Sequence, residues 1–175
     1  MKRSSGFWQF IGFIFTSVAG VLLHFAYDWS GQSPLVAPFS GVNESTWEHM
    51  KLLFFPMLVF ALIESRFLQK DHPDFWCIKL YGTLFGLALI PIFFYTFNGA
   101  FGPSPDWYNI SIYFQAAAAA YLLEATLFKK EEVSCLSPTL AFGILLLIAV
   151  AFGVFTWSPP KFPLFQDPIT GQYGL

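Results

Sequence analysis

The chain has 175 residues, of which 55% are hydrophobic, 21% are aromatic and only 11% are charged. Soluble domains usually carry about 25% charged residues, so this composition excludes an ordinary soluble protein and indicates an integral membrane protein. The formal net charge is −2, and the basic residues form no basic stripe. We therefore do not expect nucleic acid as a partner.

Five windows of about 20 mainly apolar residues are each long enough to cross the hydrocarbon core of a bilayer. In chain order they cover residues 7–27, 44–68, 75–98, 107–128 and 136–157, and a proline-rich tail, 158–175, follows them. Glycine, proline and charged residues separate the windows. The sequence predicts an all-α fold in which residues 1–175 form a single transmembrane domain, a bundle of five helices.

The distribution of basic residues predicts the orientation, because cytoplasmic loops are enriched in Lys and Arg. On the five-span topology, seven of the nine basic residues fall on the side where the chain begins: Lys2, Arg3, Arg66, Lys70, Lys79, Lys129 and Lys130. We therefore expect a multi-pass protein of the cell membrane with a cytoplasmic N-terminus and an extracytoplasmic C-terminus. Cys77 and Cys135 fall on the same inner side, where a reducing cytosol predicts free thiols rather than a disulfide.

Two acidic residues, Glu64 and Glu124, lie close to the inner ends of their predicted helices. Ionisable groups within a membrane are costly unless they are paired, and Arg66 and Lys79 are available as partners. We interpret these four residues as inner-face ion pairs. A proton relay or a transport role is the alternative.

At the outer end, polar residues from two helices gather at one level. His24 and Asp28 are four residues apart, as are Glu44 and Glu48, so each pair shares a helix face. His49 follows Glu48 directly. These five residues are the candidates for a ligand or metal site.

Two interpretations of this outer cluster remain open. In the structural one, Asn43, Ser45 and Glu48 cap the start of the second helix, with Ser45 and Glu48 forming a capping box. In the functional one, His24, His49 and two of the carboxylates bind a divalent metal such as zinc, and a further carboxylate acts as a general base. The spacing contains no HExxH motif, so it does not favour the functional interpretation over the structural one.

The segment 42–52, with the pattern Asn-Glu-Ser-x-Trp-Glu-His at residues 43–49, resembles a family of small bacterial integral membrane proteins of unknown function. Residues 23–31 are similar to the segment that precedes this pattern in the family. The resemblance covers most of the chain and implies a bacterial cytoplasmic-membrane protein. It implies no activity, substrate or catalytic residue.

The function that we expect first is a structural, binding or accessory membrane component with a polar pocket at the outer face. A metal-dependent hydrolase that acts on a lipid or peptide at this face is the alternative, and a small oligomeric transporter is the second. Whether the protein is an enzyme stays open. Expected partners are the lipid bilayer and either a protein partner or further copies of the chain. The tail, 158–175, either folds back over the outer face as a lid or is disordered.

Overall fold

The computed structural model describes residues 5–135 and 137–175. This part of the chain forms helices and no strand: α1 (Ser5–Trp29), α2 (Thr46–Leu68), α3 (Phe75–Phe101), α4 (Asp106–Leu127), α5 (Pro138–Trp157) and the short 3₁₀ helix η1 (Pro163–Phe165). The predicted all-helical fold with five helices is confirmed. Each helix end lies within three residues of the range expected from the sequence.

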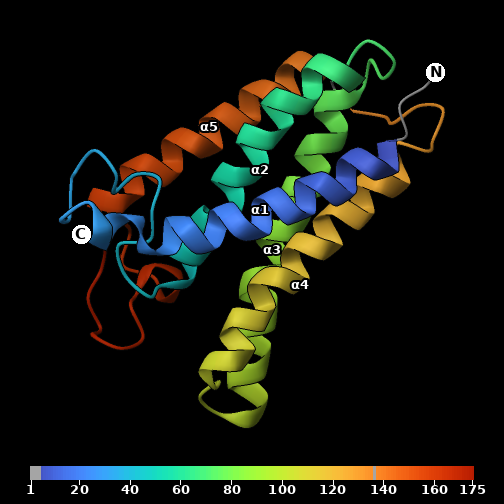
Figure 1. The fold of residues 1–175 in the computed structure, drawn as a ribbon. Helices are drawn as coiled ribbons and strands as arrows, with labels where there is room; N and C mark the ends of the chain where they lie inside the picture. Colours follow the sequence, from blue (N-terminus) through green and yellow to red (C-terminus); the bar gives the residue numbers. More distant parts are fainter. Residues whose placement is uncertain (1–4, 136) are drawn as a thin grey trace.

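Helix α2 lies at the centre of the fold and is the most buried of the five (Figure 1). It contacts α1, α3 and α5, while α3 and α4 pair as a hairpin whose α4 arm also contacts α1. Leu53, Phe54 and Met57 of α2 are almost completely buried in the apolar core. The end of the α3–α4 hairpin extends away from the loop that joins α1 to α2 (Figure 1).

Four of these helices, α1, α3, α4 and α5, are long and apolar enough to cross a membrane. Helix α2 is not among them, so five transmembrane helices are not confirmed. Its sequence gives the reason, because α2 carries Glu48, Lys51, Glu64 and Arg66. The first three of these side chains are buried among the other helices. Protein rather than lipid surrounds these charges.

Small residues on α1 allow α4 to approach closely. A Cβ atom at Gly20 would lie 1.9 Å from the hydroxyl oxygen of Tyr113, and one at Gly12 would lie 2.5 Å from a ring carbon of Tyr121. Thr16 lies halfway between the two glycines, and its hydroxyl shares a hydrogen bond of 2.8 Å with that of Tyr121. Close backbone approach and a few polar contacts are the main sources of helix association in a bilayer.

The tail after α5 is folded. Phe165 of η1 is buried against Trp47 at the start of α2, with 4.7 Å between the ring centroids. Gln166 and Tyr173 form an isolated β-bridge, and Leu175 N donates to Thr156 O at 2.9 Å. The tail therefore packs back onto the end of the bundle opposite to the one where α1 begins (Figure 1).

A disulfide joins Cys77 on the first turn of α3 to Cys135 just before α5, with the two Cα atoms 6.0 Å apart. The expectation of free thiols is therefore wrong. The same segments are also joined by a hydrogen bond of 2.8 Å from Val133 N to the carboxylate of Asp74. The two cysteines are 58 residues apart in sequence, and only the packing of α3 against α5 brings them together.

Candidate functional site

The start of α2 is built by side chains that satisfy free backbone amides, as helix N-termini require. Ser45 is the N-cap residue, and its hydroxyl accepts a hydrogen bond from Glu48 N at 3.4 Å. Asn43 Oδ1 accepts from Ser45 N at 2.9 Å, and Asn43 Nδ2 donates to Gly174 O at 3.0 Å. Asn43 and Ser45 thus occupy capping positions, and Asn43 also ties the tail to α2.

The contacts of the Glu48 carboxylate differ from those of the expected capping box. In that motif its carboxylate would accept from Ser45 N. Here it accepts from Val42 N at 3.0 Å, and it forms an ion pair of 2.5 Å with Lys51. Both contacts are made by Oε2 of the carboxylate, and both partners belong to the protein.

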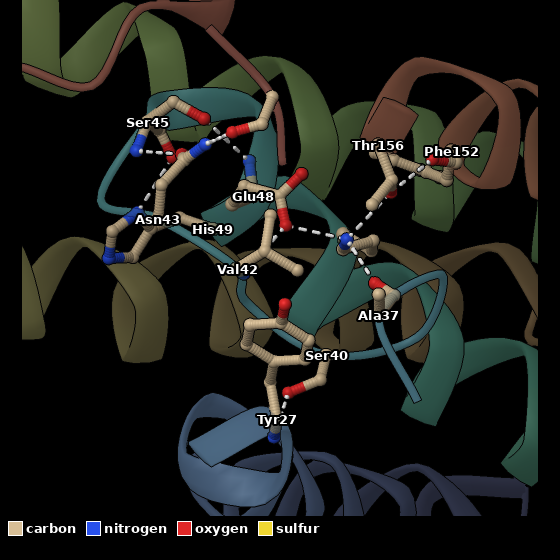
Figure 2. A network of polar contacts seen from close by, with 12 residues as sticks. Tyr27, Ala37, Ser40, Val42, Asn43, Ser45, Glu48, His49, Phe152 and Thr156 are labelled. Carbon is tan, nitrogen blue, oxygen red and sulfur yellow. Dashed lines mark hydrogen bonds and ion pairs between the residues drawn. The ribbon is translucent and has the colours of Figure 1, made fainter. Parts of the chain in front are cut away.

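The partners of Lys51 place this ion pair between the α1–α2 loop and α5. Lys51 Nζ donates to Ala37 O at 2.8 Å and to Thr156 Oγ1 at 3.0 Å. Figure 2 shows the Glu48 side chain turned toward Ala37 and Thr156, away from His49. Glu48 therefore belongs to a buried polar network and does not join the histidines.

Two of the remaining candidates, His24 and His49, meet at Glu44. Its carboxylate lies between two imidazoles, with 3.7 Å from Oε1 to His24 Nε2 and 3.5 Å from Oε2 to His49 Nε2. The centroids of the two rings are 5.9 Å apart. His49 Nδ1 lies 2.9 Å from Ser45 O. Because a carbonyl oxygen only accepts, Nδ1 carries the hydrogen and Nε2 is the atom that faces Glu44.

Asp28 does not pair with His24 as the four-residue spacing suggested. Its side chain is exposed, and it lies with His24, Val42 and Glu44 on the wall of a small cavity of about 260 Å³. His24 is instead turned toward Glu44.

Within residues 5–135 and 137–175, no group of three His, Cys, Asp or Glu side chains is placed to hold a metal ion. The zinc-like site considered from the sequence is therefore not supported. Glu48 is paired with Lys51, which leaves one carboxylate, that of Glu44, between the two histidines. The hydrolase interpretation relied on a further carboxylate as a base, and Glu48 is not free for that role.

A larger cavity of about 610 Å³ lies between α1, the start of α2, the α3–α4 hairpin and the tail. His24, Glu44 and His49 line one side of it. Its walls are largely apolar and include these side chains: Val21, Phe25, Leu52, Ile90, Phe94 and Ile110. The pocket is thus more apolar than the polar pocket expected from the sequence.

The far side of this cavity carries a second polar group from the α3–α4 turn. Asn98, Ser104, Asp106 and Asn109 line it. Ser104 Oγ donates to Asn109 Oδ1 at 2.6 Å, and Ser104 N donates to Asn98 Oδ1 at 2.9 Å. The site residues expected from the sequence include none of these four. Their position beside the Gly-Pro-Ser-Pro turn was the available signal.

The four residues expected to form ion pairs at the inner face are only partly brought together. Lys79 pairs with Glu64 and lies 2.5 Å from Glu124 Oε2, inside the bundle. Arg66 is exposed on α2. Gln9 of α1, which the sequence did not single out, donates from Nε2 to Glu64 Oε1 at 2.6 Å.

Five packed helices, four of them apolar enough to span a membrane, define a helical chain of the kind that is embedded in a bilayer. The chain belongs to a family of unknown function, DUF6512, whose sequence profile matches residues 1–175. No curated protein and no solved structure matches the chain. The expected membership of a family of unknown function is confirmed, and the family supplies no activity.

Proposed function

We propose that the protein is a multi-pass protein of the cell membrane that binds an amphipathic lipid in a binding or accessory role. In this proposal α2 crosses the bilayer with the other four helices, and the N-terminus is cytoplasmic because Lys and Arg are enriched at that end. The C-terminus and the 610 Å³ cavity then lie at the outer side.

The cavity is the observation that carries the proposal. Its volume is within the range of about 300–1,000 Å³ that small-molecule sites occupy. Apolar walls with a few converging polar groups are also typical of such sites. A molecule with a hydrocarbon part and a polar head matches this distribution, and the membrane supplies such molecules.

The charges in the cavity favour one kind of head group. Glu44 and Asp106 both line the cavity, and an ionised carboxylate only accepts hydrogen bonds. A protonated primary amine donates three hydrogen bonds and carries the complementary charge. We therefore propose a lipid with an amine head group, such as phosphatidylethanolamine, as the ligand.

Photolabelling tests this proposal. The protein, in nanodiscs that contain phosphatidylethanolamine with a diazirine in one acyl chain, is irradiated, and labelled peptides are identified by mass spectrometry. Labelling is expected on cavity-lining residues of α1, α3 and α4. Val21→Trp fills the cavity and is expected to lower this labelling several-fold. Val18→Trp is the matched control, because Val18 is exposed on the same helix and does not line the cavity.

The head-group preference has its own test. Unlabelled phosphatidylethanolamine is expected to compete for the site, whereas anionic phosphatidylglycerol is not. A Glu44→Gln and Asp106→Asn double variant is expected to lose this difference between the two lipids. Equal labelling of the Val18→Trp and Val21→Trp proteins would refute binding in the cavity, and equal competition by both lipids in the wild type would refute the amine preference.

A further inference from the structure

A second polar site lies inside the bundle near the end where α1 begins. Four helices contribute one residue each: Gln9 from α1, Glu64 from α2, Lys79 from α3 and Glu124 from α4. At most 2% of any of these residues is exposed. We call these four residues the buried cluster.

The three donor hydrogens of the Lys79 ammonium group have three acceptors. Lys79 pairs with Glu64, lies 2.5 Å from Glu124 Oε2 and donates to Gln9 Oε1 at 3.3 Å. The rings of Phe75, Tyr121 and Phe128 surround the same Nζ, each with its centroid 5.6 Å away. An ammonium group donates only three hydrogen bonds, so Lys79 has no hydrogen left for a further acceptor.

The charges of the buried cluster do not balance. With every group ionised, two carboxylates face one ammonium, which leaves one negative charge in excess among the described residues. A buried charge without a partner is strongly destabilising, even after the protein relaxes. Two carboxylates that share one site avoid this cost when one of them is protonated.

The excess negative charge lies closest to Glu124, because one oxygen of its carboxylate has no partner in the part of the chain that the structure describes. Among the described residues, Oε1 of Glu124 is buried and has no hydrogen-bond partner. It lies against Gly82 of α3, where a Cβ atom would be 2.4 Å from it. Among the same residues, Oε2 of Glu64 also lacks a hydrogen bond of regular geometry, but it forms the ion pair with Lys79, and Gln9 donates to Glu64 Oε1.

We propose that the buried cluster is a proton-binding site, in which Glu124 holds one exchangeable proton beside the ion pair of Lys79 and Glu64. The bound proton makes the site neutral, as one ammonium, one carboxylate and one carboxylic acid. Release of the proton leaves the second carboxylate ionised and without a counter-charge.

The other groups that face the buried cluster do not supply this charge. Helix α1 contributes the neutral amide of Gln9, α2 contributes Glu64 and α3 contributes Lys79. Helix α4 contributes Tyr121 beside Glu124, and the Tyr121 hydroxyl is turned to Thr16. Tyr113, which donates to Thr16 O at 2.7 Å, lines the large cavity. The proposal does not depend on a ligand in the cavity.

Infrared spectroscopy tests the proposal directly, because the carbonyl stretch of a carboxylic acid is separate from the bands of a carboxylate. Exposed carboxyl groups ionise at about pH 4, so at neutral pH only a retained proton gives the acid band. The wild-type protein in a detergent without ester or carboxyl groups is expected to show this band at neutral pH and to lose it reversibly at alkaline pH. The Glu64→Gln and Glu124→Gln variants are each expected to lack it, because the remaining carboxylate pairs with Lys79. Glu131→Gln changes an exposed glutamate and is the matched control.

Thermal stability gives a second measurement on the same proteins. The folded wild type holds a proton that the unfolded chain has released, so its stability is expected to fall as the pH rises from neutral to alkaline. Glu124→Gln is expected to remove most of this fall. Absence of the acid band in the wild type, or its persistence in both glutamine variants, would overturn the proposal. A pH dependence of stability that is the same in the wild type and Glu124→Gln would overturn it as well.

Discussion

Glu48 and Lys51, three residues apart on α2, form an ion pair whose Oε2 and Nζ atoms are 2.5 Å apart. Both side chains are almost completely buried, so water solvates neither charge. Lys51 also binds Ala37 O in the α1–α2 loop and Thr156 on α5. The pair therefore joins three segments of the chain at one point.

Removal of one residue of the Glu48–Lys51 pair is expected to lower the free energy of unfolding much more than removal of both. Lys51→Met leaves the Glu48 carboxylate buried and unpaired, which is expected to lower the free energy of unfolding by about 3–5 kcal/mol. Thermal unfolding in detergent, followed by circular dichroism, measures the loss. Lys161→Met, at an exposed lysine in the tail, is the control. A Glu48→Gln and Lys51→Met double variant is expected to recover part of the loss, and a double variant as unstable as Lys51→Met would contradict the ion-pair argument.

The helices could be predicted from the sequence because their signals are local. Long apolar windows mark each helix, and the serine at the start of α2 is an N-cap that the sequence suggests directly. The same reasoning counted α2 as one span among five. It could not indicate that α2 lies at the centre, because that depends on which helices pack around it.

The polar partners were harder to predict, since they come from distant segments. Glu48 and Glu44 look equivalent in sequence, yet one pairs with Lys51 and the other faces two histidines. Local spacing also paired His24 with Asp28, whereas the loop between α1 and α2 brings Glu44 to His24. Gln9 gave no signal at all, because its role depends on the packing of α1 against α2.

Gly20 is expected to be intolerant of even one methyl group. A Cβ there would lie 1.9 Å from Tyr113 Oη and 3.0 Å from Leu52 O, so α1 or Tyr113 has to move. Gly20→Ala is expected to destabilise the protein by about 1–3 kcal/mol, as overpacking of a core usually does. Gly143→Ala on α5 is the matched control, because no atom lies within 4 Å of the added carbon.

The Gly143→Ala protein is expected to unfold at the same temperature as the wild type or slightly above it, since alanine favours a helix over glycine. Tyr113→Phe removes the hydroxyl that clashes with the Cβ atom of Gly20→Ala. The double variant is therefore expected to lose less stability than the sum of the losses in the two single variants. Additive losses in this double-mutant cycle would show that the two residues do not interact.

The folded tail is expected to depend on Phe165. This side chain is 7% exposed and packs against Trp47, so Phe165→Ala removes the main apolar contact of η1. We expect trypsin to cut after the exposed Lys161 at least several-fold faster in this variant, because the tail must unfold locally to enter a protease. Ile169→Ala, at a tail residue that is 78% exposed, is the control. Equal cleavage rates in the Phe165→Ala and wild-type proteins would contradict the packed tail.

The disulfide between Cys77 and Cys135 is expected to form in the purified protein. Without a reductant, neither cysteine is expected to react with iodoacetamide, and both react after reduction. The Cys77→Ser and Cys135→Ser double variant is expected to lose about 2–4 kcal/mol of stability, because the cross-link constrains the unfolded chain. Alkylation of both cysteines in the unreduced protein would contradict the disulfide.

The same two cysteines provide a test of orientation in intact cells. The disulfide lies at the end of the bundle that the basic residues predict to be cytoplasmic, yet disulfides persist mainly in oxidising compartments. With a cytoplasmic N-terminus, a membrane-impermeant maleimide is expected to leave Cys77 and Cys135 unlabelled even after treatment of the cells with an impermeant reductant. A cysteine placed at Ile169 on the exposed tail, in the Cys77→Ser and Cys135→Ser background, is expected to be labelled in the same cells. The opposite result is labelling of Cys77 and Cys135 only after the impermeant reductant, with no labelling at position 169. It would show that the N-terminus lies outside, because the disulfide would then face the oxidising side.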